Sequence, residues 1–252
     1  MAITSELNLQ KAYLLHSRPY RDNRLLVNLL TEENGHVSAV VYVGKGGSKG
    51  KSANKKGLLQ PFAKLDVELK GNGALKNLSK VENAEKSLPL ESDYLFSGFY
   101  LNELMVRLLP ENIELESLFE FYQTSINQLA NKDQIEPILR QFELTLLTEL
   151  GLSLDFSILD LQQNQNPNNY DIREPHFDCH YYLPEQGFVL ANFAGKTPAY
   201  NTEHLRMIGD GNFHQADVLL TFKRLMRQVL QGYLGNKPLN SRKLFSNKFK
   251  NN

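Results

Sequence analysis

The chain has little sulfur and no tryptophan: its 252 residues include one cysteine, Cys179, and no Trp. A single cysteine excludes an internal disulfide and any zinc site built on CxxC pairs. No apolar run approaches the roughly 20 residues that cross a bilayer, and the first ten residues lack a basic region followed by an apolar one. We therefore expect a cytoplasmic protein without a membrane partner, and 41% hydrophobic residues are enough for sizeable cores.

The formal net charge is zero, but the charges are segregated along the chain. Residues 1–82 carry 13 basic and 7 acidic side chains, residues 83–174 carry 5 and 16, and residues 175–252 carry 10 and 5. Such segregation says little about fold, but it concentrates positive potential where a polyanion can be steered and held. Nucleic acid is therefore the first partner to consider.

The basic excess of the first block is concentrated in one stretch, GKGGSKGKSANKKG, which spans Gly44–Gly57. Its five glycines, two serines and five lysines favour a mobile, exposed loop. Mobile lysines suit contact with phosphates of variable position. A surface loop that is merely solvated remains an alternative.

Five strand-length segments bounded by turn signals fill the first 82 residues. They are Lys11–Ser17, Leu25–Glu33, Val37–Val43, Phe62–Gly71 and Leu75–Glu82. Asn34-Gly35 and Gly71-Asn72-Gly73 are typical of tight hairpin turns. Five strands with a long basic connection after the third predict an OB-fold barrel, although strand count alone also allows an SH3-like barrel.

After Pro89 the apolar spacing becomes helical, so we expect an α+β protein with a barrel domain at 1–82 and a helical domain at 83–252. The helices predicted from apolar spacing and capping signals cover residues 93–109, 115–130, 135–150 and 216–231. Gly151 is expected to cap the third in the left-handed conformation. Two short strands, CHYYL and FVLAN, are predicted between the third and fourth helices.

Catalytic and metal-binding interpretations find little support in the sequence. GKGGSKGKS resembles a phosphate-binding P-loop, but its spacing before Gly50-Lys51-Ser52 is wrong, and Gly57 and Pro61 argue against the helix that must follow. His176, Cys179 and His180 lack a fourth ligand and are read as a buried cysteine and two surface histidines. We therefore expect no enzyme, no metal and no cofactor, with a P-loop nucleotidase as a disfavoured alternative.

Several segments, in order, are similar to the bacterial recombination mediator RecO family. The segments that carry the resemblance are AYLLHSRPYRDNRLLVNLLTEENGHVSAVVYVGKG from residue 12, LLQPF from 58, GNGALKNLSKVE from 71, SGFYLNEL from 97, LRQFELTLLTELG from 139 and YLGNKPLNSRKLF from 233. The resemblance runs from about Lys11 to Phe249. It implies an OB domain joined to a helical domain, without catalytic activity.

The resemblance also implies a set of partners and a role in DNA repair. RecO-like proteins bind single- and double-stranded DNA, anneal complementary strands, engage the acidic C-terminal tail of the single-strand binding protein SSB, and act with RecR and RecF to load RecA. A nucleoid-associated protein of the cytoplasm is then expected. A general RNA-binding or ribosome-associated module that uses the same barrel is the main alternative.

Candidate contact residues follow from the charge pattern and the resemblance together. The residues expected near DNA phosphates are Arg18, Arg21, Arg24, Lys45, Lys49, Lys51, Lys55 and Lys56. Tyr20 and Tyr42 are candidates for stacking on bases, with core packing an alternative for Tyr42. The residues expected to bind the SSB tail, which combines acidic residues with an aromatic, are Arg140, Lys223, Arg224 and Arg227. Each of these four is also compatible with an ordinary solvated surface.

One stretch departs from part of the family. Some RecO-like proteins carry a four-cysteine zinc ribbon, whereas residues 153–198 of this chain contain only Cys179. A degenerate, metal-free ribbon is expected there. Its packing would come from four aromatic residues, Phe177, Tyr181, Tyr182 and Phe188.

Overall fold

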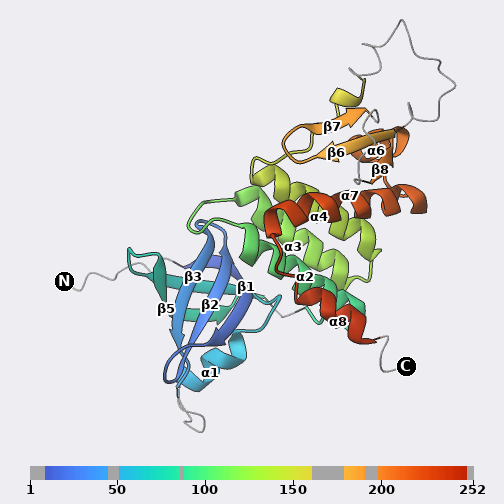
Figure 1. The fold of residues 1–252 in the computed structure, drawn as a ribbon. Coiled ribbons are helices and arrows are strands. Elements are labelled where there is room, and N and C mark those ends of the chain that lie inside the picture. The colour runs from blue at the N-terminus through green and yellow to red at the C-terminus, as the bar shows by residue number, and fades with distance from the viewer. Residues whose placement is uncertain (1–8, 45–50, 86–87, 161–178, 191–197, 249–252) are drawn as a thin grey trace, which may run out of the picture. The chain divides into compact units, whose positions relative to one another are not determined.

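The first five strands of the chain close into a barrel (Figure 1). The computed structural model describes residues 9–44, 51–85, 88–160, 179–190 and 198–248. The strands of the barrel are β1 Gln10–Pro19, β2 Arg24–Thr31, β3 Gly35–Tyr42, β4 Lys64–Lys70 and β5 Leu75–Asn83. Their spatial order is β1-β2-β3-β5-β4, with β4 pairing back onto β1 and β5 running parallel to β3. This Greek-key order confirms the predicted OB-type barrel.

Alternation of side chains places one face of each strand inside the barrel. On β3, Val37, Ala39 and Val41 are fully buried, while the residues between them face outward. Val27 and Leu29 of β2 point to the same interior. The barrel core is therefore apolar, and charged side chains of these strands lie on its outer surface.

The connection between β3 and β4 contains a helix, α1 Lys51–Leu58, where the sequence predicted a mobile loop over Gly44–Gly57. The prediction is wrong for residues 51–57, and residues 45–50 lie outside the described part of the chain. Leu59, which follows the helix, is buried in the barrel core, and Leu58 packs against it. Burial of this apolar end explains why a helix forms in spite of Gly57.

The chain divides into two compact units. Unit 1 comprises residues 1–135 and 238–252, and unit 2 comprises residues 136–237. Unit 1 adds three helices to the barrel: α2 Ser92–Leu108, α3 Glu116–Ala130 and α8 Ser241–Lys248. β5 ends at Asn83, next to the predicted domain boundary after residue 82. The compact units divide after residue 135 and before residue 238 instead. The division into domains at 1–82 and 83–252 stays a prediction. None of the described helices is long and apolar enough to cross a membrane.

Unit 2 contains helices and a small sheet. Its elements are α4 Ile135–Glu149, whose first residue belongs to unit 1, β6 Cys179–Leu183, β7 Gly187–Leu190, β8 Ala199–Asn201, α6 Thr202–Gly209 and α7 Ala216–Leu234. The predicted helices and the strand CHYYL are confirmed, as is FVLAN for residues 188–190, while residues 191 and 192 lie outside the described part of the chain. β8 and α6 were not foreseen. Gly151 has a φ of 71° and ends α4 as predicted, with Leu152 N–H donating to Leu147 O at 2.8 Å.

A buried polar network fastens α2 and α3 to the barrel in unit 1. The Asn102 side-chain amide on α2 donates to Leu15 O of β1 at 3.1 Å, and its carbonyl oxygen accepts from the Tyr122 hydroxyl of α3 at 2.7 Å. At the start of β3, the Ile113 carbonyl lies where a side chain on Gly35 would stand, so only glycine fits. These contacts join the barrel to α2 and α3 within unit 1.

The sheet of unit 2 has the order β7-β6-β8 and packs on aromatic residues. Tyr182 and Phe188 are buried with ring centroids 5.7 Å apart, and Phe156 lies 5.2 Å from Phe188. Tyr181 is half-buried, and Phe177 lies outside the described residues. A ribbon-like character of this region stays a prediction.

Candidate nucleic-acid interface

The β1–β2 hairpin presents three arginines at one end of the barrel. Arg18 and Arg24 lie on the two strands, and Arg21 lies in the turn between them, where Arg21 and Asn23 adopt φ values of 45° and 54°. The Tyr20 N–H closes the turn on Arg24 O at 2.9 Å. All three arginines are exposed, and none forms an ion pair with the residues that the structure describes. Their positive charge is therefore available to an anionic ligand.

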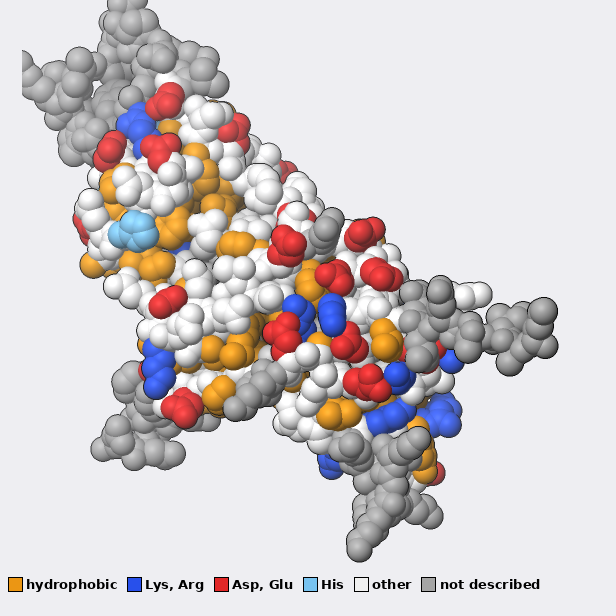
Figure 2. All heavy atoms as spheres, turned by 180° about the vertical axis from the view of Figure 1, so that it is seen from behind, with side chains coloured by type: hydrophobic (Ala, Val, Ile, Leu, Met, Phe, Trp, Pro, Cys, Tyr) orange, Lys and Arg blue, Asp and Glu red, His pale blue; other side chains and the backbone are white. Residues whose placement is uncertain are grey.

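Lysines of the β3–β4 connection are only partly described. Lys56 is exposed, whereas the Lys55 ammonium donates to Ser79 O of β5 at 2.8 Å and so helps to hold α1 on the barrel. Lys51 is the first residue of α1. Lys45 and Lys49 lie outside the described residues. Lys and Arg side chains nevertheless gather over the barrel, in the lower right of Figure 2.

The two candidate stacking residues differ in how open their rings are. Tyr20 is half-buried, and the Arg21 guanidinium carbon lies 5.4 Å from its ring centroid in a cation–π contact. Tyr42 is 50% exposed, which corrects the alternative of core packing. The ring of Tyr42 is therefore more accessible to a ligand than the ring of Tyr20.

The four candidates for the SSB tail lie in unit 2, and two of them already have partners. Arg140 is buried, and its guanidinium lies 2.8 Å from the carboxylate of the fully buried Glu143. Lys223 of α7 donates to Glu136 of α4 at 2.5 Å. Glu143 is thus an acidic residue on the buried side of α4. Arg140 and Lys223 thus have structural roles in addition to any role in binding.

Arg224 and Arg227 lie on the outer side of α7 and are exposed. Leu220, one turn before Arg224, is 60% exposed. The Arg224 guanidinium carbon lies 5.7 Å from the ring centroid of Tyr200 on β8, which orients the arginine. This outer side, which we call the α7 surface (Leu220, Arg224, Arg227), combines an apolar side chain with two cations. Sequence reasoning missed Leu220, although its spacing of i, i+4, i+7 with the arginines was visible.

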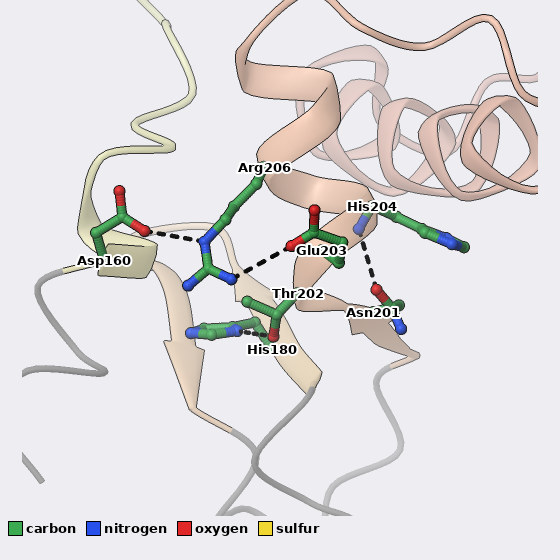
Figure 3. A network of polar contacts seen from close by, with 7 residues as sticks. All are labelled: Asp160, His180, Asn201, Thr202, Glu203, His204 and Arg206. Atoms are coloured by element: carbon green, nitrogen blue, oxygen red, sulfur yellow. Dashed lines mark hydrogen bonds and ion pairs between the residues drawn. The ribbon is translucent and has the colours of Figure 1, made fainter.

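Polar contacts join β6 and Asp160 to α6 in unit 2 (Figure 3). Arg206 donates to Asp160 at 2.9 Å and lies 3.6 Å from Glu203, while His180 Nδ1 lies 2.8 Å from Thr202 Oγ1. Burial, with a smaller effect of the Arg206 charge, lowers the pKa of His180 to about 4. His180 is therefore neutral near pH 7.

The histidine and cysteine that suggested metal ligands have other environments. His180 was expected on the surface but is fully buried. Cys179 was expected to be buried but is only half-buried. His176 lies outside the described residues. Within the described part of the chain, no group of three or more His, Cys, Asp or Glu residues could hold a metal ion.

Two family models match nearly the whole chain. The model described as Recombination protein O N terminal matches residues 6–86, and Recombination protein O C terminal matches residues 91–243. The chain belongs to the RecO family. Its role therefore lies in DNA repair and recombination. The N-terminal match ends just after β5, so it coincides with the barrel.

Curated relatives named DNA repair protein RecO are similar over nearly their full length. The one from Cellvibrio japonicus is 40% identical over 95% of this chain and 97% of the relative. Those from Actinobacillus succinogenes and Vibrio cholerae are 37% and 35% identical over 94% of this chain, and cover 94% and 93% of the relatives. The RecO resemblance found in the sequence is confirmed.

Proposed function

We propose that the chain is a non-catalytic recombination mediator that binds single- and double-stranded DNA through the arginine-rich end of its barrel. The observation that carries the proposal is the exposed, unpaired state of Arg18, Arg21 and Arg24 among the described residues of an OB barrel. Barrels of this type bind oligonucleotides on the face of the second and third strands and on neighbouring loops. Family membership supports the same assignment.

The positive charge of these arginines also supports the proposed annealing of complementary DNA strands. Two strands that repel one another must be held close while base pairing is sampled, and cations lower this repulsion without reading sequence. Lys56 and, in part, Lys55 add to the arginines. Lys45, Lys49 and Lys51 are proposed to act with them. Binding should be insensitive to sequence and sensitive to salt.

The α7 surface is the proposed site for the SSB C-terminal tail. An acidic peptide that ends in an aromatic residue needs an apolar contact beside cations, and Leu220, Arg224 and Arg227 supply both. Arg140 and Lys223 are proposed to contribute indirectly, since their ion pairs with α4 residues support this region. RecR, RecF and, through them, RecA are the further proposed partners.

The DNA-binding proposal is tested by the salt dependence of affinity for an oligonucleotide. Each neutralised phosphate of single-stranded DNA contributes about 0.7 to the slope of log K against log salt. Replacing Arg18, Arg21 and Arg24 with Ala should weaken binding and lower the slope by about 2. A control removes three cations outside the barrel, Lys132, Lys237 and Arg242, and should change the slope less. An unchanged slope in the arginine variant contradicts the assignment, and stronger binding to structured RNA than to DNA favours the RNA-binding alternative.

The tail proposal is tested separately, by strand annealing on SSB-coated DNA. Leu220→Ala with Arg224→Ala and Arg227→Ala should abolish annealing on coated DNA and leave annealing of bare DNA unchanged. Equal annealing on SSB that lacks its C-terminal tail would contradict the proposal.

A further inference from the structure

The outer face of the barrel near the arginines is defined by strand register. On β3, Ala39 and Val41 point into the core, so Val40 and Tyr42 point outward. On β2, Leu25 packs against the core, so Arg24 and Leu26 point outward.

The register brings these outward residues into rows across three strands. Arg24 is directly opposite Tyr42, and Leu26 is directly opposite Val40. Arg18 of β1 is opposite Leu26 on its other side. Directly opposed residues on one face have their Cβ atoms about 5 Å apart. We call these five residues the outer platform: Arg18, Arg24, Leu26, Val40 and Tyr42.

The platform combines features that suit different parts of a nucleotide. Tyr42 is half exposed, and within the described residues no ring or guanidinium covers it. Leu26 and Val40 are half-buried apolar residues next to it. Arg18 and Arg24 flank this apolar strip and lack ion-pair partners among the described residues. A flat ring with adjacent cations favours a base with its phosphate.

The opposite end of the same face carries negative charge. One row beyond Val40, the Ser38 hydroxyl donates to the carboxylate of Glu111, which follows α2. This carboxylate repels phosphates and ends the cationic part of the face. The platform therefore has room for a short stretch of strand at the arginine end.

We infer that Tyr42 makes the outer platform selective for single-stranded over double-stranded nucleic acid, by stacking on an unpaired base while Arg18 and Arg24 bind its phosphates. In a duplex the bases are stacked on one another, and the platform meets phosphates alone. The inference rests on the proposed function, because it assigns a specificity to the same barrel surface. Stacking of one base on an aromatic side chain is worth about 5- to 150-fold in affinity.

The lack of tryptophan offers a direct test. Tyr42→Trp introduces the only Trp of the chain, and its fluorescence should be quenched when a single-stranded oligonucleotide binds and should change little with a duplex. Tyr233→Trp is the matched control, since Tyr233 is 46% exposed on α7 of unit 2, and should respond to neither. Equal quenching by both nucleic acids, or none at saturation, overturns the inference.

Affinity measurements complete the test. Tyr42→Ala should weaken single-strand binding by about 5- to 150-fold and change duplex binding less than about twofold, whereas Tyr42→Phe and Tyr233→Ala should bind as the wild type does. Equal losses for both nucleic acids overturn the inference but leave the proposed function intact. A wild-type protein that binds neither nucleic acid overturns the proposed function itself.

Discussion

The guanidinium of Arg140 and the carboxylate of Glu143 form an ion pair in the interior of the protein, 2.8 Å apart on the same side of α4. The Glu143 side chain is fully buried and that of Arg140 is 7% exposed. Charges removed from water in this way depend on each other, because removing one leaves the other buried without the opposite charge that faces it.

Arg140→Met should therefore destabilise the protein by about 3 kcal/mol, because it removes the guanidinium that neutralises a buried carboxylate. The double variant Arg140→Met, Glu143→Leu should recover most of the loss. Lys223→Met is the control: its pair with Glu136 is about 40% exposed, so at most about 1 kcal/mol should be lost. Urea unfolding followed by circular dichroism measures all three. A double variant no more stable than the single one would contradict the explanation.

Asn102 should be harder to replace than Tyr122, its hydrogen-bond partner on α3. Asn102→Ala leaves the Leu15 carbonyl and the Tyr122 hydroxyl without this partner in a buried site, at a cost of about 2–3 kcal/mol. Tyr122→Phe removes one hydroxyl and should cost about 1 kcal/mol. Thermal and urea unfolding provide the comparison. Equal effects of the two variants would show that Asn102 does not bridge β1 and α3.

Glu103 should make the attachment of α8 dependent on pH. Burial by itself raises the pKa of Glu103, but the N–H groups of Ser241 and Asn240 and the Ser241 hydroxyl outweigh it and leave the pKa below its ordinary 4.5. The stabilisation is fully present above pH 4.5 and is lost as the pH falls through the lower pKa of the folded state. Hydrogen exchange of the α8 amides should show this loss.

Glu103→Gln is the matched variant for this measurement. Gln keeps the shape of the side chain but has no charge, so α8 should be less protected at pH 7 by about 0.5–2 kcal/mol, with a weaker dependence on pH. Protection of α8 equal to that of the wild type across the pH range would refute the role of the carboxylate.

His180 should lower the stability of unit 2 in mild acid. Its pKa is about 4 in the folded protein and 6.5 in the unfolded chain, so the unfolded state takes up a proton first as the pH falls below 6.5. Stability should be about 2 kcal/mol lower at pH 5 than at pH 8 from this residue alone. His180→Asn, which does not titrate, should show a smaller decline. Titration of His180 near pH 6.5 by NMR in the folded protein would contradict this.

The barrel could be predicted because its strands alternate regularly. Val37, Ala39 and Val41 are separated by outward residues, and Asn34-Gly35 marks the turn before them. The helix α1 could not be foreseen, because its stability depends on burial of Leu58 and Leu59 in the barrel core and not on its own glycine-containing sequence. Short elements such as β8 and α8 have too few residues to show a period.

For the candidate site, the sequence showed which cationic residues were present but not which of them already form ion pairs within the protein. Arg18, Arg21 and Arg24 were found because arginines cluster at a predicted turn, and they are exposed. Arg140 was read as accessible although Glu143 lies four residues from both Leu139 and Leu147 on the buried face of α4. A carboxylate on an apolar helix face requires a nearby cation, and this missed signal identifies Arg140.

The polypeptide enters unit 2 after residue 135 and returns to unit 1 at residue 238, where Glu103 receives the start of α8. Unit 2 is therefore an insertion in the sequence of unit 1, which is built from two separate segments of the chain. A fragment that stops at residue 135 or at residue 237 has the barrel but leaves the surface of α2 under Phe245 bare. The smallest intact version of unit 1 is therefore a spliced chain in which a linker joins Ile135 to Pro238.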